Sequence, residues 1–146
     1  MMNFVKLRIS GEDIDLEKVS STLNMTPKFI CKKNDINYNK ITNQSITYSE
    51  DCWIAGIEIE HEEETERKIS EFIDLLYKNK NTIQQFSTMH HITLWITLNQ
   101  DTMQYNLHFS KEVLNKVSDL GIDIDITCMQ LQEFYTETYL SDKINE

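Results

Sequence analysis

Glycine, proline and cysteine are all scarce in this chain of 146 residues, which has three glycines, one proline and three cysteines. Three glycines leave little room for a phosphate-cradling loop, and the chain carries no P-loop, dinucleotide-binding, serine-hydrolase or zinc-protease motif. The cysteines, Cys31, Cys52 and Cys128, show no Cys-x-x-Cys spacing. We therefore expect neither a disulfide framework nor a zinc knuckle, and a reducing, cytoplasmic location.

Long apolar runs and positive charge are also lacking. The N-terminus has no hydrophobic signal region, and no segment approaches the length of a membrane span. Twenty-four acidic residues against 14 basic ones give a formal net charge of −10. This charge repels nucleic-acid phosphates and anionic membrane surfaces, so we expect neither as a partner. It suits either plain solubility or a basic protein partner.

The chain does contain enough hydrophobic residues to form one core. Hydrophobic residues make up 40% of the sequence, including two Trp, six Tyr and six Phe. That composition and length predict a single domain, which we place at residues 1–130. We expect residues 131–146 to form a partly ordered C-terminal tail.

Hydrophobic periodicity predicts the order of the elements. Alternation of apolar and polar residues predicts strands over 4–10, 53–60, 91–98 and 122–128, with shorter ones over 28–33 and 105–109. A period of 3.6 predicts helices from Asp13 or Asp15 to Asn24, over 62–80, and from Ser110 to Gly121. Residues 82–89 add a short helical turn, and the polar stretch 34–51 is a long loop or an irregular hairpin.

This order predicts an α+β fold with a mostly antiparallel sheet and three helices on one face, in ferredoxin-like layers. Two segments are alike. Leu7-Arg-Ile-Ser10 and Leu107-His-Phe-Ser110 each precede a helix that contains Lys-Val-Ser. A divergent internal duplication and a coincidence of two strand–helix units explain this similarity equally well.

The sheet face opposite the helices is expected to be partly open, and it carries the candidate site. The alternation assigns to it the side chains of Lys6, Arg8, Glu58, Glu60, His91, Thr93, Trp95, His108, Asp123 and Asp125. Exposed tryptophans are enriched at binding hot spots. We therefore predict a partner-binding surface made of Trp95, Glu58, Glu60, His91, His108, Asp123 and Asp125. The alternative is that segment 34–50 or the C-terminal tail covers Trp95.

Metal and catalytic readings of these residues are weaker. His91 and His108 could meet across strands with Asp123 or Asp125 as a third ligand, but surface histidines near Trp95 are the preferred interpretation. Asp123 and Asp125 resemble a magnesium-binding pair that lacks a third carboxylate. Cys128 falls on the buried phase of its strand, and the other cysteines have no base nearby in sequence. We expect no catalytic residue, no metal and no cofactor.

Several motifs, taken in order, resemble the bacterial family known as domain of unknown function 4279, over residues 3 to about 130. The motifs are Phe4-x-x-Leu-Arg-Ile-Ser-Gly-Glu-Asp13, Asp15-Leu-Glu, Leu23-x-x-x-Pro27, Trp53 opening a strand, Ile69-x-x-Phe-Ile-x-Leu-Leu76, Leu107-x-Phe-Ser110 and Leu120-Gly-Ile-Asp-Ile-Asp125. The chain departs from the family pattern at Asn24, where Gly is favoured, and in its glycine-poor segment 34–50. The resemblance implies small standalone cytoplasmic proteins with no established activity. It also implies an immunity-type role, because some members are encoded beside toxin systems.

The expected function is therefore that of a non-catalytic cytoplasmic binding protein, in its specific form an immunity-type inhibitor of a basic protein partner such as a toxin. The alternative is a small-ligand sensor or an enzyme that uses a pocket between the sheet and segment 34–50. A third option is a homo-oligomer whose sheet faces pair with each other.

Overall fold

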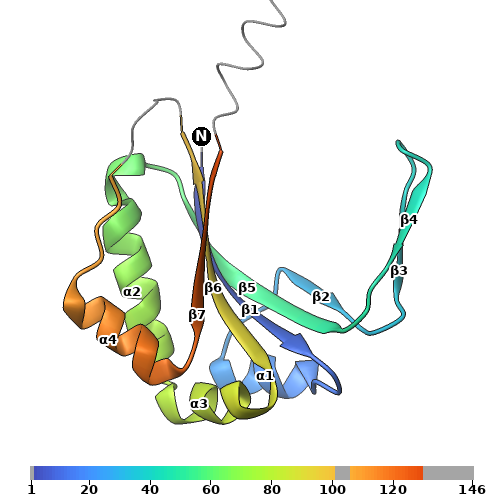
Figure 1. Cartoon of the computed structure of the whole chain (residues 1–146), viewed down its shortest axis with the longest axis horizontal. Helices are drawn as coiled ribbons and strands as arrows, with labels where there is room; N and C mark the ends of the chain where they lie inside the picture. Colours follow the sequence, from blue (N-terminus) through green and yellow to red (C-terminus); the bar gives the residue numbers. More distant parts are fainter. Residues whose placement is uncertain (1, 101–105, 130–146) are drawn as a thin grey trace, which may run out of the picture.

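The computed structural model describes residues 2–100 and 106–129, which form a five-stranded sheet with helices packed on one face (Figure 1). The strand order is β2-β5-β1-β6-β7. The strands of this sheet are β1 (Asn3–Gly11), β2 (Phe29–Cys31), β5 (Asp51–Ile59), β6 (His91–Asn99) and β7 (Asp123–Met129). The helices are α1 (Leu16–Leu23), α2 (Thr65–Tyr77), α3 (Lys80–Met89) and α4 (Lys111–Leu120), with a 3₁₀ turn η1 (Glu62–Glu64) before α2.

Strand β1 lies at the centre of the sheet and shows the predicted alternation. Val5, Leu7 and Ile9 are fully buried under the helices, whereas Lys6 and Arg8 point to the other face and are half-buried. Both neighbours, β5 and β6, run antiparallel to β1. Because the side-chain period of a strand is two, this register places one apolar row of each strand in the same core.

The last strand pairs differently from the sequence-based expectation. Strand β7 runs parallel to β6, with Asp125 opposite Trp95, and α4 forms the crossover between them. The predicted hairpin into a strand over 105–109 is wrong, since residues 106–110 form no strand and Tyr105 lies outside the described residues. Leu107 and Phe109 are instead partly buried against the core. Two apolar side chains separated by one residue can both face the core in an extended segment that pairs with no strand.

Local capping signals set the helix ends. The Asp15 side chain accepts a hydrogen bond from the Lys18 backbone N–H at 3.1 Å, and Asn24 ends α1 in the left-handed conformation. Ser110 caps α4, and Gly121 ends it with a φ of 71°. The prediction of three helices is wrong for the described residues, which hold four α-helices. The expected turn over 82–89 extends back to Lys80 because Ile83 and Phe86 both reach the core.

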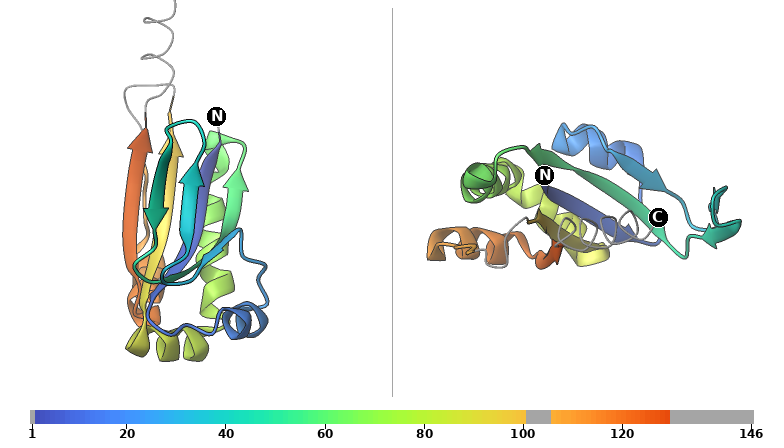
Figure 2. Two further views of the ribbon diagram at one scale, coloured as in Figure 1. Left: turned by 90° about the vertical axis from the view of Figure 1, so that its right-hand side faces the viewer. Right: turned by 90° about the horizontal axis from the view of Figure 1, so that it is seen from above.

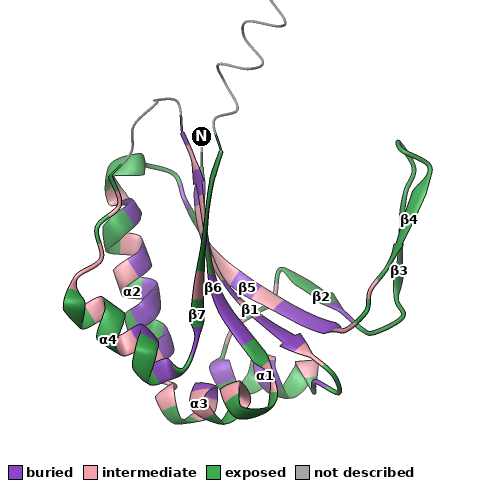
Figure 3. Cartoon of the chain, in the orientation of Figure 1, coloured by how far each residue is buried: buried purple, intermediate pink, exposed green. Residues whose placement is uncertain are grey.

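Of the two expectations for segment 34–51, the hairpin is correct, and its two strands pair in a regular register. Among the described residues, strands β3 (Ile36–Asn39) and β4 (Gln44–Thr47) pair with each other and with no other strand, and every residue in them is exposed. We call this hairpin the arm. It stands off the sheet on the side away from the helices (Figure 2), and its exposure contrasts with the buried inner rows of the sheet (Figure 3).

The coarse prediction of an α+β fold with a mostly antiparallel sheet is confirmed. The duplication is not supported, because Leu7–Ser10 belongs to the central strand whereas residues 107–110 belong to no strand. The expected ferredoxin-like arrangement is not supported either, because the strand order is β2-β5-β1-β6-β7 and the last two strands are parallel. In the described part of the chain, none of the helices is long and apolar enough to cross a membrane.

Candidate functional site

The sheet face that the helices leave uncovered carries a mixture of charged, polar and aromatic side chains. We call it the open face. Reading across the register from β2 to β7, it presents Phe29, Cys31, Cys52, Ile54, Glu58, Phe4, Lys6, Arg8, His91, Thr93, Trp95, Thr97, Asp123, Asp125 and Thr127. The arm projects from the β2–β5 side of this face (Figure 1), so the face has a wall along one margin.

Trp95 lies near the middle of the open face and is 37% exposed. Its cross-strand partners are Lys6 on β1 and Asp125 on β7. The indole Nε1 lies 3.5 Å from Thr127 Oγ1 on the same side. The ring is thus held at one edge and remains partly exposed, as expected of a residue that contacts a partner.

Two adjoining hollows open on this face, and both are lined by Arg8 and Trp95. The first measures about 350 Å³ and is completed by Thr93, Asp125 and Thr127, with Ile126 behind them. The second measures about 340 Å³. Besides Arg8 and Trp95, its lining is Phe29, Cys31, Tyr48, Ser49, Glu50, Cys52 and Ile54. This second hollow lies at the position expected for a pocket between the sheet and segment 34–50.

Arg8 is the cation at the boundary of the two hollows. Its pKa is raised above the usual value, first by a hydrogen bond to the Cys52 side chain and also by the charge of Glu50. The guanidinium Nη2 lies 3.6 Å from Glu50 Oε1. Arg8 therefore stays charged, and part of its charge is already balanced within the site.

Five of the seven predicted partner-binding residues lie on the open face. Trp95 and Asp125 line the first hollow together. His91 Nε2 lies 3.5 Å from Asp123 Oδ2 at one end of β6 and β7. Glu58 Oε1 lies 3.5 Å from Lys28 Nζ near the β2 margin, so its charge is partly balanced.

The strand register does not place the other two predicted residues on this surface. Glu60 directly follows the end of β5 at Ile59, beyond the paired strands. His108 lies in the helix layer, where its backbone N–H donates to Glu66 Oε1 at 2.6 Å. A metal site shared by His91 and His108 is therefore wrong. Within residues 2–100 and 106–129, no group of three His, Cys, Asp or Glu side chains is placed to hold a metal ion.

Trp95 remains accessible in the described part of the chain. The nearest part of segment 34–50 is its end, where Tyr48, Ser49 and Glu50 wall the second hollow rather than cover the indole. The tail that was the other expected cover lies outside the described residues. The open face therefore keeps an exposed aromatic centre between two charged margins.

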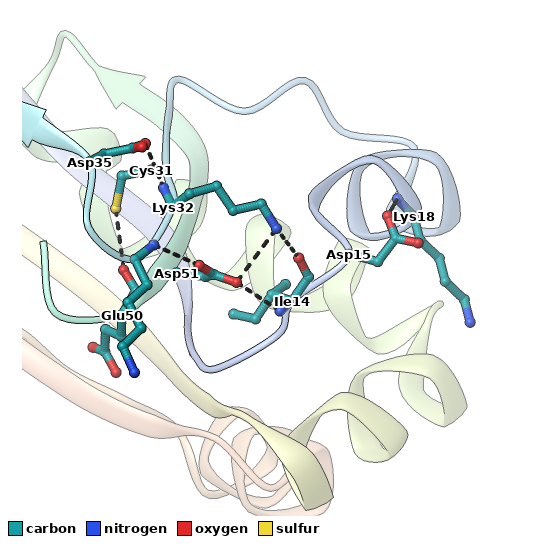
Figure 4. A network of polar contacts seen from close by, with 9 residues as sticks. Ile14, Asp15, Lys18, Cys31, Lys32, Asp35, Glu50 and Asp51 are labelled. Atoms are coloured by element: carbon teal, nitrogen blue, oxygen red, sulfur yellow. Dashed lines mark hydrogen bonds and ion pairs between the residues drawn. The ribbon is translucent and has the colours of Figure 1, made fainter.

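Sequence reasoning missed Asp51, which joins the arm to the domain (Figure 4). This buried carboxylate accepts hydrogen bonds from the backbone N–H groups of Lys33 at 2.8 Å and Ile14 at 3.0 Å. Lys32 Nζ lies 3.5 Å from it and donates to the Ile14 carbonyl at 2.8 Å. The Lys33 bond, followed by the Ile14 bond and the Lys32 charge, lowers the pKa of Asp51 although burial opposes this. The one sequence feature that could have indicated this role is the position of Asp51 at the start of a strand.

The cysteines also lie differently from their sequence interpretation. Cys31 and Cys52 are buried at the roots of the arm, whereas Cys128 is exposed although it lies on the helix side of β7. Strand β7 is an edge strand, and its residues from Asp125 to Met129 are exposed on both sides. Burial raises the pKa of the Cys31 thiol, with a further contribution from the neighbouring Cys52.

Comparison with known proteins supports the family resemblance. The model of the family described as Domain of unknown function (DUF4279) matches residues 2–131, so the chain belongs to that family. No curated protein and no solved structure matches this chain.

Proposed function

We propose that this member of the DUF4279 family is a non-catalytic binding protein that holds a basic protein partner on its open face. The specific form that we propose is an immunity-type inhibitor acting in the cytoplasm. The observation that carries the proposal is the pairing of Trp95 with Asp125 in one hollow of an uncovered sheet face. An aromatic ring beside a carboxylate forms a receptor for a lysine or arginine side chain.

The charges around the hollow favour a cationic rather than an anionic group. Asp125 has no ion pair among the described residues, whereas Arg8 already faces Glu50 at 3.6 Å. The net charge of −10 adds a long-range attraction for a basic surface. A partner side chain that enters between Trp95 and Asp125 would thus be drawn in and then desolvated against the indole.

The residues that line the two hollows also support binding over catalysis. Their cysteines are not accompanied by a histidine in either lining, and the described lining holds no pair of facing carboxylates. Nucleophilic and acid–base mechanisms both need such a neighbour within hydrogen-bond reach. The site has the composition of a recognition surface, with an aromatic centre and charged margins.

Comparative capture from the native cells tests this proposal. Tagged wild-type protein is compared with Trp95→Ala and Asp125→Asn, and the matched controls are Leu114→Ala and Glu112→Gln on exposed positions of α4. We expect one basic protein to be retained by the wild type and both controls. Both open-face variants should lose it by roughly tenfold or more. Equal retention by all folded variants would show that the open face is not the binding surface.

A small-ligand site is the second candidate, and the second hollow favours it. Phe29, Tyr48 and Ile54 supply apolar walls, while Arg8 and Glu50 supply polar groups of both signs. Such a mixture of walls and a few polar groups is typical of ligand pockets. Native mass spectrometry of the purified protein distinguishes the candidates, since a bound small molecule released on unfolding supports the second one. Sedimentation tests the homo-oligomer, which would bury the same face.

A further inference from the structure

Cys31 and Cys52 form a facing pair of thiols at the floor of the second hollow. They are directly opposite each other in the antiparallel pairing of β2 with β5. Both side chains lie on the open face, and the residues are 4% and 5% exposed. Both are free cysteines, and the Cys31 thiol donates to the Glu50 carbonyl at 3.7 Å.

The strand register alone brings this pair within bonding reach. Directly opposed residues of an antiparallel pair have Cα atoms about 4.5–5.5 Å apart. Disulfide-bonded cysteines have Cα atoms about 4.4–6.8 Å apart, so the two ranges overlap fully. Closing the bond therefore needs side-chain rotation, with no separation or sliding of the two strands.

The pair also stands at the two roots of the arm. Cys31 ends β2 just before the chain enters the arm, and Cys52 lies in β5 just after the chain leaves it. The neighbouring Asp51 already ties the Lys33 backbone to this point at 2.8 Å (Figure 4). A bond between the cysteines would close the loop that contains the whole arm and would hold the wall of the second hollow.

We propose that Cys31 and Cys52 are a reversible disulfide site that a small peroxide oxidises, locking the arm at its base. The Cys52 sulfur, which lines the second hollow together with Arg8, attacks one peroxide oxygen as a thiolate and becomes a sulfenic acid, with hydroxide leaving. The Cys31 sulfur then attacks the Cys52 sulfur, and water leaves as the S–S bond forms. In total, two thiols are oxidised to one disulfide and hydrogen peroxide is reduced to two waters. A cytosolic dithiol reductant reverses the reaction, as is usual for disulfides that serve as switches.

Cys128 provides an internal control for this proposal. It lies on β7, at the opposite edge of the sheet from β2, and is exposed. It therefore cannot reach the pair, and a bond that involves it must join two chains. Oxidation of Cys128 therefore reports on an exposed thiol, and a bond within one chain reports on the facing pair Cys31 and Cys52.

The experiment treats the full chain carrying Cys128→Ser with hydrogen peroxide and then blocks free thiols under denaturing conditions. We expect the intact mass to fall by about two units with no blocking group added, and peptide mapping to join Cys31 to Cys52. The midpoint of thermal unfolding should rise by several degrees, because the bond closes a loop of the unfolded chain. Treatment with dithiothreitol should reverse both changes. Cys31→Ser and Cys52→Ser should each lose the two-unit change and keep one blockable or over-oxidised thiol.

Two results would overturn the proposal. In the first, both thiols remain blockable after a peroxide exposure that oxidises Cys128 in the wild type. In the second, oxidation yields only disulfide-linked dimers. The outcome does not depend on what the open face binds, so its failure and that of the proposed binding function are distinguishable. If the disulfide forms and the open face binds a partner, oxidised and reduced protein should differ in affinity for that partner, because the two hollows share Arg8 and Trp95, and Cys52→Ser should remove that difference.

Discussion

The two faces of one sheet show how differently the same strands are used. On the helix side, β1 contributes Val5, Leu7 and Ile9, all without exposed surface, while its alternate side chains Lys6 and Arg8 stay half-buried on the open face. The two tryptophans are divided in the same way. Trp53 is fully buried and donates from Nε1 to Ser20 Oγ at 2.9 Å, whereas Trp95 is 37% exposed. Helix cover makes the first face a core, whereas no helix covers the second face in the described part of the chain.

The difference also separates stability from binding. A buried side chain contributes to folding through the apolar area it removes from water and through close packing. A side chain on the open face contributes little of this until a partner covers it. Substitutions on the two faces should therefore fall into two classes, and each prediction below tests that division.

The largest effect on stability is expected at Trp53. Trp53→Ala should lower the free energy of unfolding by about 3–5 kcal/mol, because it leaves a large cavity between β5 and α1 and removes the hydrogen bond that the indole donates to the Ser20 hydroxyl. Urea titration followed by circular dichroism measures this. Trp53→Phe is the control, and its free energy of unfolding should fall by less than half of the amount that Trp53→Ala loses. A loss below about 1 kcal/mol would contradict the assignment of this face as the core.

The next effect is expected at Asp51, where the sheet meets the arm. Asp51→Asn should lower the free energy of unfolding by about 1–3 kcal/mol, since an amide cannot accept all the hydrogen bonds that the carboxylate receives. Asp35→Asn is the matched control, because among the described residues the exposed Asp35 carboxylate accepts one hydrogen bond, from the Lys32 backbone N–H. If both variants lose the same small amount, Asp51 does not hold the arm root.

Acid dependence gives an independent test of Asp51. Its pKa is lower in the folded than in the unfolded chain, so its carboxylate stabilises the fold above the unfolded pKa of about 3.9. As the pH falls below that value and through the folded pKa, the unfolded state binds the proton first and this contribution is lost. The wild type should therefore lose more stability than Asp51→Asn between roughly pH 5 and pH 2. Parallel acid profiles of the two proteins would contradict the lowered pKa.

Trp95→Ala should change stability by less than about 1 kcal/mol, because the indole is partly exposed and its hydrogen bond to Thr127 is long. The same variant should lose the captured partner, so its binding and stability effects should diverge. Trp53→Phe should show the opposite pattern, with a lower free energy of unfolding and unchanged capture of the partner. Loss of folding in Trp95→Ala would place Trp95 with the core and would break the division.

The smallest effect is expected at Glu58. Glu58→Gln should change the free energy of unfolding by no more than about 0.5 kcal/mol, since its ion pair with Lys28 at 3.5 Å is exposed and screened. Glu58→Lys places two cations together and should weaken capture of a basic partner, most visibly at low salt. A salt-independent loss of capture would point to local unfolding rather than to lost attraction.

Much of the fold was predictable because its signals are local. Alternation over Val5–Ile9 and over Ile92–Leu98 identified the two central strands, and the caps at Asp15, Asn24 and Gly121 identified helix ends. The same alternation correctly assigned Trp95, Asp123 and Asp125 to one face. Each of these inferences depends only on neighbouring residues and on the period of a strand or helix.

The wrong predictions concern contacts between distant segments. Alternating apolar residues at Leu107 and Phe109 suit a strand, but here they pack in the helix layer, which also removed His108 from the predicted surface. Segment 34–50 has few apolar residues, so the sequence left a loop and a hairpin both open and did not show that a hairpin would project from the sheet as an arm. The Asp51 and Cys31–Cys52 contacts were invisible because their partners lie far apart along the chain.

The amino-acid sequence by itself determined which residues of each strand are apolar, where helices begin and end, and the acidic charge that suits a basic partner. Only the tertiary structure decided that β7 runs parallel to β6 beside Trp95, that the arm projects from one margin of the open face, and that two cysteines face each other at its base. The physical reason is range. Periodicity and capping act within a few residues, whereas strand order and register depend on which distant surfaces exclude water together.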